Sequence, residues 1–342
     1  MENKTSLGAA PPILQTVPLD FRWPALSPFL FCVHHVDHYP PANDSLGPDA
    51  SLAGRDIGQD FAGIDNWRMY HGDTVPGFPG HPHRGFETVT YVRRGLIDHA
   101  DSKGASARYG RGDVQWLTAG SGVQHAEMFP LLDQEGPNPL ELFQIWLNLP
   151  AEDKSADAFF EMFWDGDIPR VTAEGVSVTV IAGALEGLTP PQPPPHSWAA
   201  RPDTDVAIWH IVMDPGSTWT LPPARFEDTG RVLYLFEGEG IEISGQGISA
   251  RTGAVLDPTR AATLTSTGHT EMLILQGRPI DEPVATHGPF VMNTQDEIVQ
   301  AFEDYRRTQF GGWPWDRPDP VHGTDPAHFA RYPDGTVRRP GL

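Results

Sequence analysis

The sequence predicts an all-β protein made of two tandem units, and three observations support this prediction. The chain has 342 residues, more than one typical domain, so two domains are expected, each large enough to bury a core. Its 35 glycines and 35 prolines, with 39% hydrophobic residues, favour many short strands over long helices. From residue 81 onward, short apolar runs alternate with glycine-containing turns, which is typical of an antiparallel sandwich or barrel.

The first unit is expected at residues 81–186, after an irregular N-terminal segment. That segment, residues 1–80, contains a proline-rich surface loop and is expected to pack on the first unit. Turn-forming residues divide the first unit into short strands. We place these strands at residues 81–94, 96–100, 105–109, 114–117, 123–129 and 140–149.

A proline-rich linker is expected between the two units, at residues 187–205, because it opens with five prolines in nine residues. The second unit then covers residues 206–310. Its run from Tyr234 to Gly238 is similar to the run from Tyr91 to Gly95 in the first unit. An internal duplication would explain this similarity, and chance is the alternative.

One helix is predicted, at residues 295–307 near the end of the second unit. Thr294 is placed to cap its first turn, with Glu297 three residues later completing a capping box. Apolar residues up to Tyr305 continue at helical spacing. Residues 311–342, rich in proline, are expected to form an extended tail that wraps a neighbour.

Two pairs of metal-binding residue types are the main functional signal. His81 and His83 are two residues apart, and so are His125 and Glu127. Side chains at i and i+2 of a strand face the same way, so each pair aims both donors at one point, and the glycine-containing turns can fold one pair against the other. Three imidazoles and one carboxylate, without a thiolate, suit iron(II), manganese, nickel, copper or zinc in a mononuclear site. The alternative is that these are ordinary surface residues in a chain with 14 histidines.

The second unit lacks an equivalent site. Carried across the internal similarity, the four donor positions fall on Ala224, Phe226, Ser266 and Gly268, none of which binds a metal well. His269 lies one residue away and is expected to be a surface or hydrogen-bonded residue. We therefore expect the second unit to support the first one structurally.

Charge and cysteine content exclude several other functions. A formal charge of −21 without a run of lysine or arginine argues against binding nucleic acid or an anionic membrane directly. Cys32 is the only cysteine and lies in an apolar stretch, so it is expected to be a buried, inert thiol. The N-terminus shows no signal sequence and no stretch is long enough to span a membrane. We expect a cytoplasmic monomer, with the nucleus as a second location in a eukaryote.

The first unit resembles the cupin superfamily, and more closely the pirin family. The cupin pattern is matched by His81, His83, Glu87 and Gly95. The resemblance to pirins rests on residues 81–89, 112–120, 125–128 and 287–294. It implies two cupin-type barrels in tandem, with one divalent metal in the N-terminal barrel only. The metal would be iron(II), with manganese, nickel, copper, zinc or cobalt as substitutes, and its ligands would be the four donors named above.

Glu87 is the residue on which the two patterns disagree. Counted by strand parity it shares a face with His81 and His83, and in many cupins this glutamate is itself a ligand. In pirins Glu127 takes that role, so Glu87 is expected to be a hydrogen-bond partner that orients the imidazoles.

The resemblance implies three functions that need the same donors. In a quercetin 2,3-dioxygenase, a small aromatic flavonol and dioxygen react at the metal with loss of carbon monoxide, and Glu127 is both a ligand and a candidate catalytic base. In an iron-dependent co-regulator, the oxidation state of the metal would alter affinity for a protein partner. In the third case the protein binds metal and any flavonol turnover is incidental. The long segment before residue 80 and the tail exceed what pirins lead us to expect, and both could reshape the mouth of the site.

Overall fold

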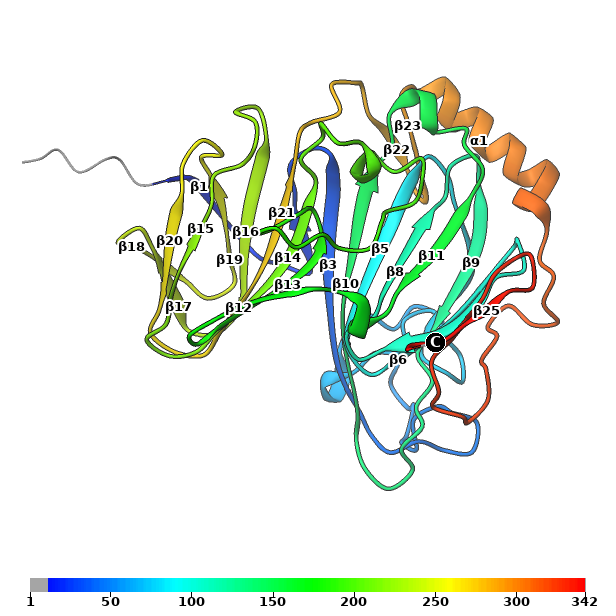
Figure 1. Ribbon diagram of the computed structural model, residues 1–342. Helices are drawn as coiled ribbons and strands as arrows, with labels where there is room; N and C mark the ends of the chain where they lie inside the picture. Colours follow the sequence, from blue (N-terminus) through cyan, green and yellow to red (C-terminus); the bar gives the residue numbers. More distant parts are fainter. Residues whose placement is uncertain (1–11, 342) are drawn as a thin grey trace, which may run out of the picture.

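The computed structural model describes residues 12–341, which form two β-barrels side by side (Figure 1). The first barrel has two six-stranded sheets, with the strand orders β11-β8-β5-β10-β3-β2 and β25-β24-β7-β6-β9-β4. The second barrel has a seven-stranded sheet, β1-β19-β16-β21-β14-β13-β12, and a four-stranded sheet, β15-β20-β17-β18. The prediction of an all-β chain with two tandem barrels and one C-terminal helix is therefore confirmed. No helix in the described part of the chain is long and apolar enough to cross a membrane.

The strands of the first barrel come mostly from the first half of the chain. Their bounds are β2 (Arg22–Pro24), β3 (Phe29–Tyr39), β4 (Gly77–His83), β5 (Phe86–Arg94), β6 (Leu96–Asp101), β7 (Ser106–Gly110), β8 (Val114–Thr118), β9 (Val123–Met128), β10 (Asn138–Asn148), β11 (Phe159–Phe163), β24 (Phe329–Arg331) and β25 (Val337–Arg338). Five of the six strands predicted from residue 81 onward are present with ends within a few residues of the predicted ones, whereas the strand predicted at 81–94 is divided at Gly85 into β4 and β5.

The strands of the second barrel include the N-terminal strand of the chain. Their bounds are β1 (Ile13–Pro18), β12 (Arg170–Ala173), β13 (Val176–Ala182), β14 (Ala207–Met213), β15 (Thr218–Leu221), β16 (Gly230–Glu237), β17 (Gly240–Ile243), β18 (Gln246–Ser249), β19 (Thr252–Leu256), β20 (Ala262–Ser266) and β21 (Thr270–Gly277). A hairpin of β22 (Ala285–His287) and β23 (Phe290–Met292) and the helix α1 (Gln295–Thr308) follow. Five single-turn 3-10 helices lie at Ile64–Asn66, Ala151–Asp153, Asp165–Asp167, Trp198–Ala200 and Gln309–Gly311.

The two barrels share an apolar interface built from alternate residues of their facing sheets. On β5, Val89 and Tyr91 face the second barrel, whereas the intervening Thr90 faces the inside of the first barrel. Trp23 lies at the centre of this interface, fully buried, with its ring centroid 5.2 Å from that of Tyr234. Both faces of β5 are thus covered by other parts of the protein, which explains why nearly all of its residues are buried.

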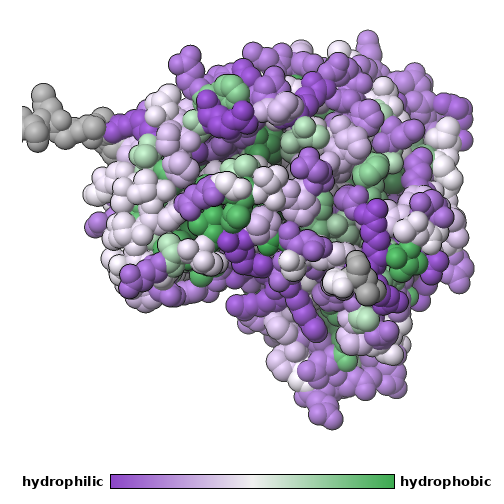
Figure 2. Space-filling view, viewed as in Figure 1, coloured by the Kyte–Doolittle hydropathy of each residue, from purple (hydrophilic) through white to green (hydrophobic). Residues whose placement is uncertain are grey.

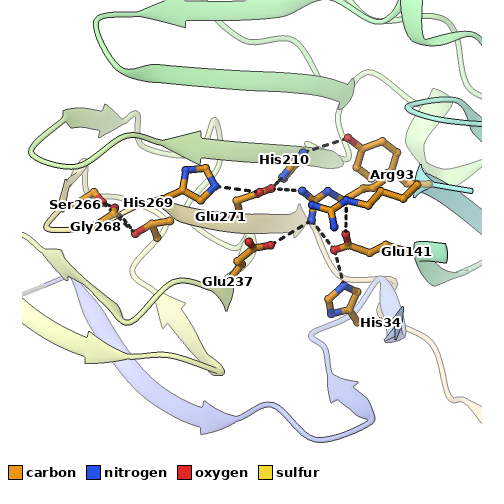
Figure 3. Close-up of polar contacts among 12 residues, drawn as sticks. His34, Arg93, Glu141, His210, Glu237, Ser266, Gly268, His269 and Glu271 are labelled. Carbon is orange, nitrogen blue, oxygen red and sulfur yellow. Dashed lines mark hydrogen bonds and ion pairs between the residues drawn. The ribbon is translucent and has the colours of Figure 1, made fainter. Parts of the chain in front are cut away.

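A chain of ion pairs crosses the same interface, as Figure 3 shows. Arg93 of β5 contacts Glu141 of β10 at 2.5 Å and Glu271 of the second barrel at 2.5 Å. His34 bonds at 3.0 Å to the same oxygen of Glu141 that Arg93 contacts, and His210 bonds at 2.8 Å to the oxygen of Glu271 that Arg93 contacts. Arg93 and both carboxylates are at most 11% exposed, so the guanidinium supplies the countercharge that two buried anions require.

Segments at both ends of the chain lie elsewhere than the sequence predicts. Residues 1–80 are not uniformly irregular, because β1 pairs with β19 of the second barrel and β3 is an eleven-residue strand between β2 and β10. Likewise β13, which the sequence assigns to the first unit, pairs with β14 of the second barrel. An alternating pattern of apolar and polar residues predicts that a strand is present, but it does not predict which strand pairs with it. The neighbours predicted for β1 and β13 are therefore wrong.

The helix and the tail both pack on the first barrel. The capping box of Thr294 and Glu297 is present, and α1 ends within one residue of its predicted end. However, Asp304 of α1 bonds to Arg84 of the first barrel at 2.8 Å, and β24 of the tail pairs with β7. Figure 1 shows the orange helix and the red tail beside the first barrel. The neighbour that the tail contacts is therefore the first barrel of its own chain, which carries the two predicted donor pairs.

We predict that the Arg93→Ala variant will be destabilised by about 3–5 kcal/mol, because it leaves Glu271 buried without an arginine and leaves Glu141 with only the exposed Arg94 at 3.6 Å. Chemical denaturation followed by tryptophan fluorescence measures the change. The matched control is Arg94→Ala at the next position, whose side chain is 55% exposed and should cost less than about 1 kcal/mol. Equal losses in the two variants would show that the interface does not depend on Arg93.

Candidate metal centre

Three of the four predicted donors lie together in the first barrel, on the adjacent antiparallel strands β4 and β9. His81 pairs with His125 in register, and His83 lies two residues further along β4. The ring centroids of His81 and His125 are 4.5 Å apart, and those of His83 and His125 are 4.9 Å apart. One donor nitrogen from each ring lies within 4.8 Å of the other two. The pairing of the two strands therefore brings the predicted motifs to one point.

Burial keeps these imidazoles neutral. It lowers the pKa of His81 to about 4, and it holds the pKa of His83 and His125 well below the usual value. Protonated imidazoles repel a metal ion, whereas neutral ones offer a lone pair without first losing a proton. At neutral pH the cluster is ready to bind a cation.

Backbone carbonyl groups orient two of the rings. Nδ1 of His81 donates to the carbonyl oxygen of Pro79 at 2.9 Å, and Nδ1 of His83 donates to that of Pro289 at 3.4 Å. Each contact fixes the tautomer with the proton on Nδ1 and leaves Nε2 free as a metal donor.

His125 provides the test of whether a metal fits. Its side chain is fully buried, and within the described residues neither ring nitrogen has a hydrogen-bond partner. An unpaired buried nitrogen costs free energy, about 1–3 kcal/mol for a typical polar group. A divalent ion at the cluster would bind one of these nitrogens, so the residues present fit the metal that the sequence predicts.

Glu127, the fourth predicted donor, lies beside the histidine cluster but outside it. Its Oε2 is 3.9 Å from Nε2 of His125 and accepts a hydrogen bond from Gln144 at 2.7 Å. Its Oε1 accepts from Thr90 at 3.1 Å and from Tyr109 at 3.4 Å. Burial raises the pKa of Glu127 above its usual value. The carboxylate is thus held next to the cluster by three donors of the barrel wall.

Glu87 does not meet the histidines, which corrects the expectation drawn from strand parity. Its two oxygens accept hydrogen bonds from Thr118 and Ser197, both at 2.6 Å, and the side chain is fully buried at the barrel interface. Parity fails because Gly85, with φ +83°, turns the chain out of β4 and into β5 of the other sheet. A Cβ at Gly85 would lie 2.0 Å from the carbonyl oxygen of Val291, so only glycine fits there.

His99 is a site residue that the sequence reading missed. It lies opposite Glu127 in the pairing of β6 with β9, and its ring centroid is 5.6 Å from that of His125. Its Nε2 donates to Asp101 at 3.3 Å, while its Nδ1 has no partner within the described residues. The signal was present in the sequence, because His99 and Asp101 repeat the same two-residue spacing of donors.

Aromatic side chains of the segment before residue 80 close the mouth of the site. A pocket of about 360 Å³ lies beside His81, lined by His71 and Phe78 among others. Phe78 also lines a small inner cavity that Glu127 and Gln144 share. The ring of Tyr70 packs 5.0 Å from Phe78. Phe78 therefore stands between the outer pocket and the carboxylate.

The second barrel holds a different group of donors, which includes His269. Glu237, His269 and Glu271 lie within 4.8 Å of one another at the barrel interface (Figure 3). Glu271 is already bound by Arg93 at 2.5 Å, and that guanidinium is 3.8 Å from Glu237. A metal ion would have to displace this cation. The positions Ser266 and Gly268 bond to each other and offer no imidazole or carboxylate.

The fold and the site define the protein class as a bicupin, two cupin barrels of which the first carries the histidine cluster. The Pirin family matches residues 25–147, and the pirin C-terminal cupin domain matches residues 208–311. A pirin-like protein of Solanum lycopersicum is 35% identical over 268 residues, covering 75% of this chain and 86% of the relative. The chain belongs to the pirin family, and it has a histidine-rich site like those with which pirin and cupin proteins bind a metal.

Two further relatives carry the name of an activity. A protein of Pseudomonas aeruginosa, named as a candidate quercetin 2,3-dioxygenase, is 39% identical over 239 residues, covering 68% of this chain and 80% of the relative. The crystal structure of a quercetin 2,3-dioxygenase from Acinetobacter baumannii covers 89% of this chain and 99% of its own, at 27% identity and a TM-score of 0.71.

We predict that the Glu87→Gln variant will change the pH dependence of stability and leave metal content unaltered. Burial raises the pKa of Glu87 to about 7 from 4.5, so the folded state binds more protons than the unfolded state between these values. The stability this group contributes is therefore present at low pH and is lost as pH rises from 4.5 to 7, by about 3 kcal/mol. Glutamine carries no titrating proton and removes this loss.

Chemical denaturation of both proteins at pH 5 and pH 8 provides the measurement. Wild type should lose more stability than Glu87→Gln over this interval. The Glu161→Gln variant on β11 is the matched control, because its side chain is 21% exposed whereas that of Glu87 is fully buried. A large drop in the metal content of Glu87→Gln would instead show that Glu87 takes part in metal binding.

Proposed function

We propose that this protein is a metal-dependent dioxygenase that opens the central ring of flavonols of the quercetin type. The observation that carries the proposal is the placement of Glu127, a buried carboxylate of raised pKa, beside a cluster of three neutral imidazoles, one of which, His81, lines an open pocket together with Phe78. The names of the relatives from Pseudomonas and Acinetobacter support the same activity.

His81, His83 and His125 would hold the metal, for which iron(II) is our first choice, and Glu127 is placed to complete the set. When bound, such an ion acts as a Lewis acid and as a template that brings a chelating substrate together with dioxygen. Proton transfer and substrate binding would be carried out by side chains of the protein.

Glu127 is suited to accept the hydroxyl proton of a flavonol. A base works best when its pKa is near the working pH, and burial moves this carboxylate in that direction. Gln144, Thr90 and Tyr109 donate hydrogen bonds to it and hold its two oxygens in place.

The aromatic wall of the mouth suits a planar substrate. Phe61, Tyr70, Phe78 and Phe129 form a set of edge-to-face and tilted contacts, with Phe78 at 5.0–6.5 Å from the others. Phe78 is the ring of this set that lines the pocket at His81 and can stack on a flat aromatic ligand, while Tyr70 and Phe129 are buried behind it.

We predict that metal-loaded protein will consume quercetin and dioxygen in equal amounts and release carbon monoxide. The Glu127→Gln variant should lower kcat/KM by about 10²–10⁴-fold, as expected for loss of a general base. Oxygen uptake and substrate absorbance, recorded together, measure both reactants.

The control is Glu242→Gln, an exposed position on β17 of the second barrel, which should leave turnover unchanged. If metal-loaded wild type shows no oxygen uptake above that of the free metal across a panel of flavonols, the protein is not a dioxygenase of this kind.

A further inference from the structure

The second barrel, which has no histidine cluster of its own, contains a cavity that the proposed activity does not use. Its volume is about 460 Å³, and all its lining residues lie between residues 183 and 276. One wall is apolar and is formed by Leu185, Ala207 and Trp209, whose side chains belong to the core of this barrel. The cavity is large enough for a small organic molecule.

A buried arginine that has no ionic partner among residues 12–341 lies behind the opposite wall. Arg231 is 1% exposed, and its side chain is directed into the barrel, where Nε bonds to Gln276 at 2.7 Å and Nη1 bonds to the carbonyl oxygen of Pro222 at 2.6 Å. Gln276 and Pro222 both line the cavity. Nη2 has no partner within the described residues.

Both partners of Arg231 are neutral, so its charge is not neutralised. Burial lowers the pKa of Arg231 to about 10, which still leaves it cationic at neutral pH. A buried charge without a counterion costs several kcal/mol, and proteins usually pair it. The nearby carboxylate of Asp205 acts on it only at longer range, because Oδ2 of Asp205 accepts from the backbone of Arg225 at 2.9 Å and from Thr229 at 3.0 Å.

A second arginine lies in the cavity wall itself. Arg225 is exposed, and its guanidinium bonds to the carbonyl oxygen of Pro202 at 3.0 Å and lies 5.3 Å from the ring centroid of Phe226. No carboxylate contacts this guanidinium within the described residues. In a chain with a net charge of −21, one arginine without an ionic partner in the cavity wall, and a second one behind that wall bonded to the lining residues Gln276 and Pro222, point to a site for an anion.

The remaining charges of the wall limit the charge of the ligand. Glu186 and Asp205 are acidic, and Arg201 is paired with Glu152 and Asp153 at 2.5 and 2.6 Å. Glu186 and Asp205 offset Arg225 and Arg231 in number, so the site holds no surplus of cations, which disfavours a ligand with several negative charges such as a di- or triphosphate.

We propose that this cavity binds a small organic monocarboxylate. Its apolar body would pack on Leu185, Ala207 and Trp209, while its carboxylate would meet Arg225 and supply the countercharge that Arg231 lacks. The site is independent of the histidine cluster, so it does not depend on the proposed dioxygenase activity.

Isothermal titration of the full-length, metal-loaded protein tests the proposal. The probes are benzoate, phenylacetate and hexanoate, with benzyl alcohol as a neutral analogue. We expect saturable binding of at least one carboxylate and at least tenfold weaker binding of the alcohol. Arg225→Gln should weaken carboxylate binding at least tenfold, and Arg231→Gln should do the same if it folds. Arg307→Gln, an equal change of charge at a position 71% exposed on α1, should have no effect.

The same titration with the His83→Ala variant separates this cavity from the histidine cluster, because a carboxylate could also bind a metal there. Binding retained in His83→Ala and lost in Arg225→Gln supports the proposal. Binding lost in His83→Ala, equal binding to Arg225→Gln and Arg307→Gln, or no binding of any of the three carboxylates at millimolar concentration would overturn it.

Discussion

The pairing of β4 with β9 is the constraint on which the metal centre depends. Antiparallel register places His81 directly opposite His125, and the two-residue repeat of a strand then brings His83 and Glu127 to the same face. A shift of one residue would turn every donor to the outside of the sheet. The irregularity between Phe78 and His81 is the point at which the strand adjusts its register before the histidines begin.

Segments that are distant in sequence keep this pairing in place. The carbonyl oxygen of Pro289 orients His83, and Tyr305 of α1 bonds at 3.0 Å to Gln124, which lies next to His125. The tail contributes through the carbonyl oxygen of Pro318, which accepts a 2.7 Å hydrogen bond from the backbone of Gly80. Contacts from the helix and the tail therefore help to hold β4 and β9, the strands of the metal centre, in place. The face of the molecule seen in Figure 2 is mostly hydrophilic, with hydrophobic residues gathered in a few patches between the polar ones.

The sequence predicts what is local and misses what depends on distant contacts. The strands from residue 81, the capped helix and the convergence of three histidines all follow from spacing over a few residues. The partner of β1 and the orientation of Glu87 do not, because one depends on a strand about 240 residues away and the other on a glycine turn between two sheets. The unpaired charge of Arg231 could not be seen either, since it depends on which neighbours are absent in space.

The most direct test of the metal centre is an anomalous diffraction map of crystals of the metal-loaded protein, recorded at the absorption edge of the metal found by elemental analysis. One peak is expected, about 2.0–2.2 Å from a nitrogen of each of His81, His83 and His125. The His83→Ala protein should lose this peak, whereas His269→Ala should keep it. A peak at Glu237, His269 and Glu271, or full occupancy in His83→Ala, would contradict the account.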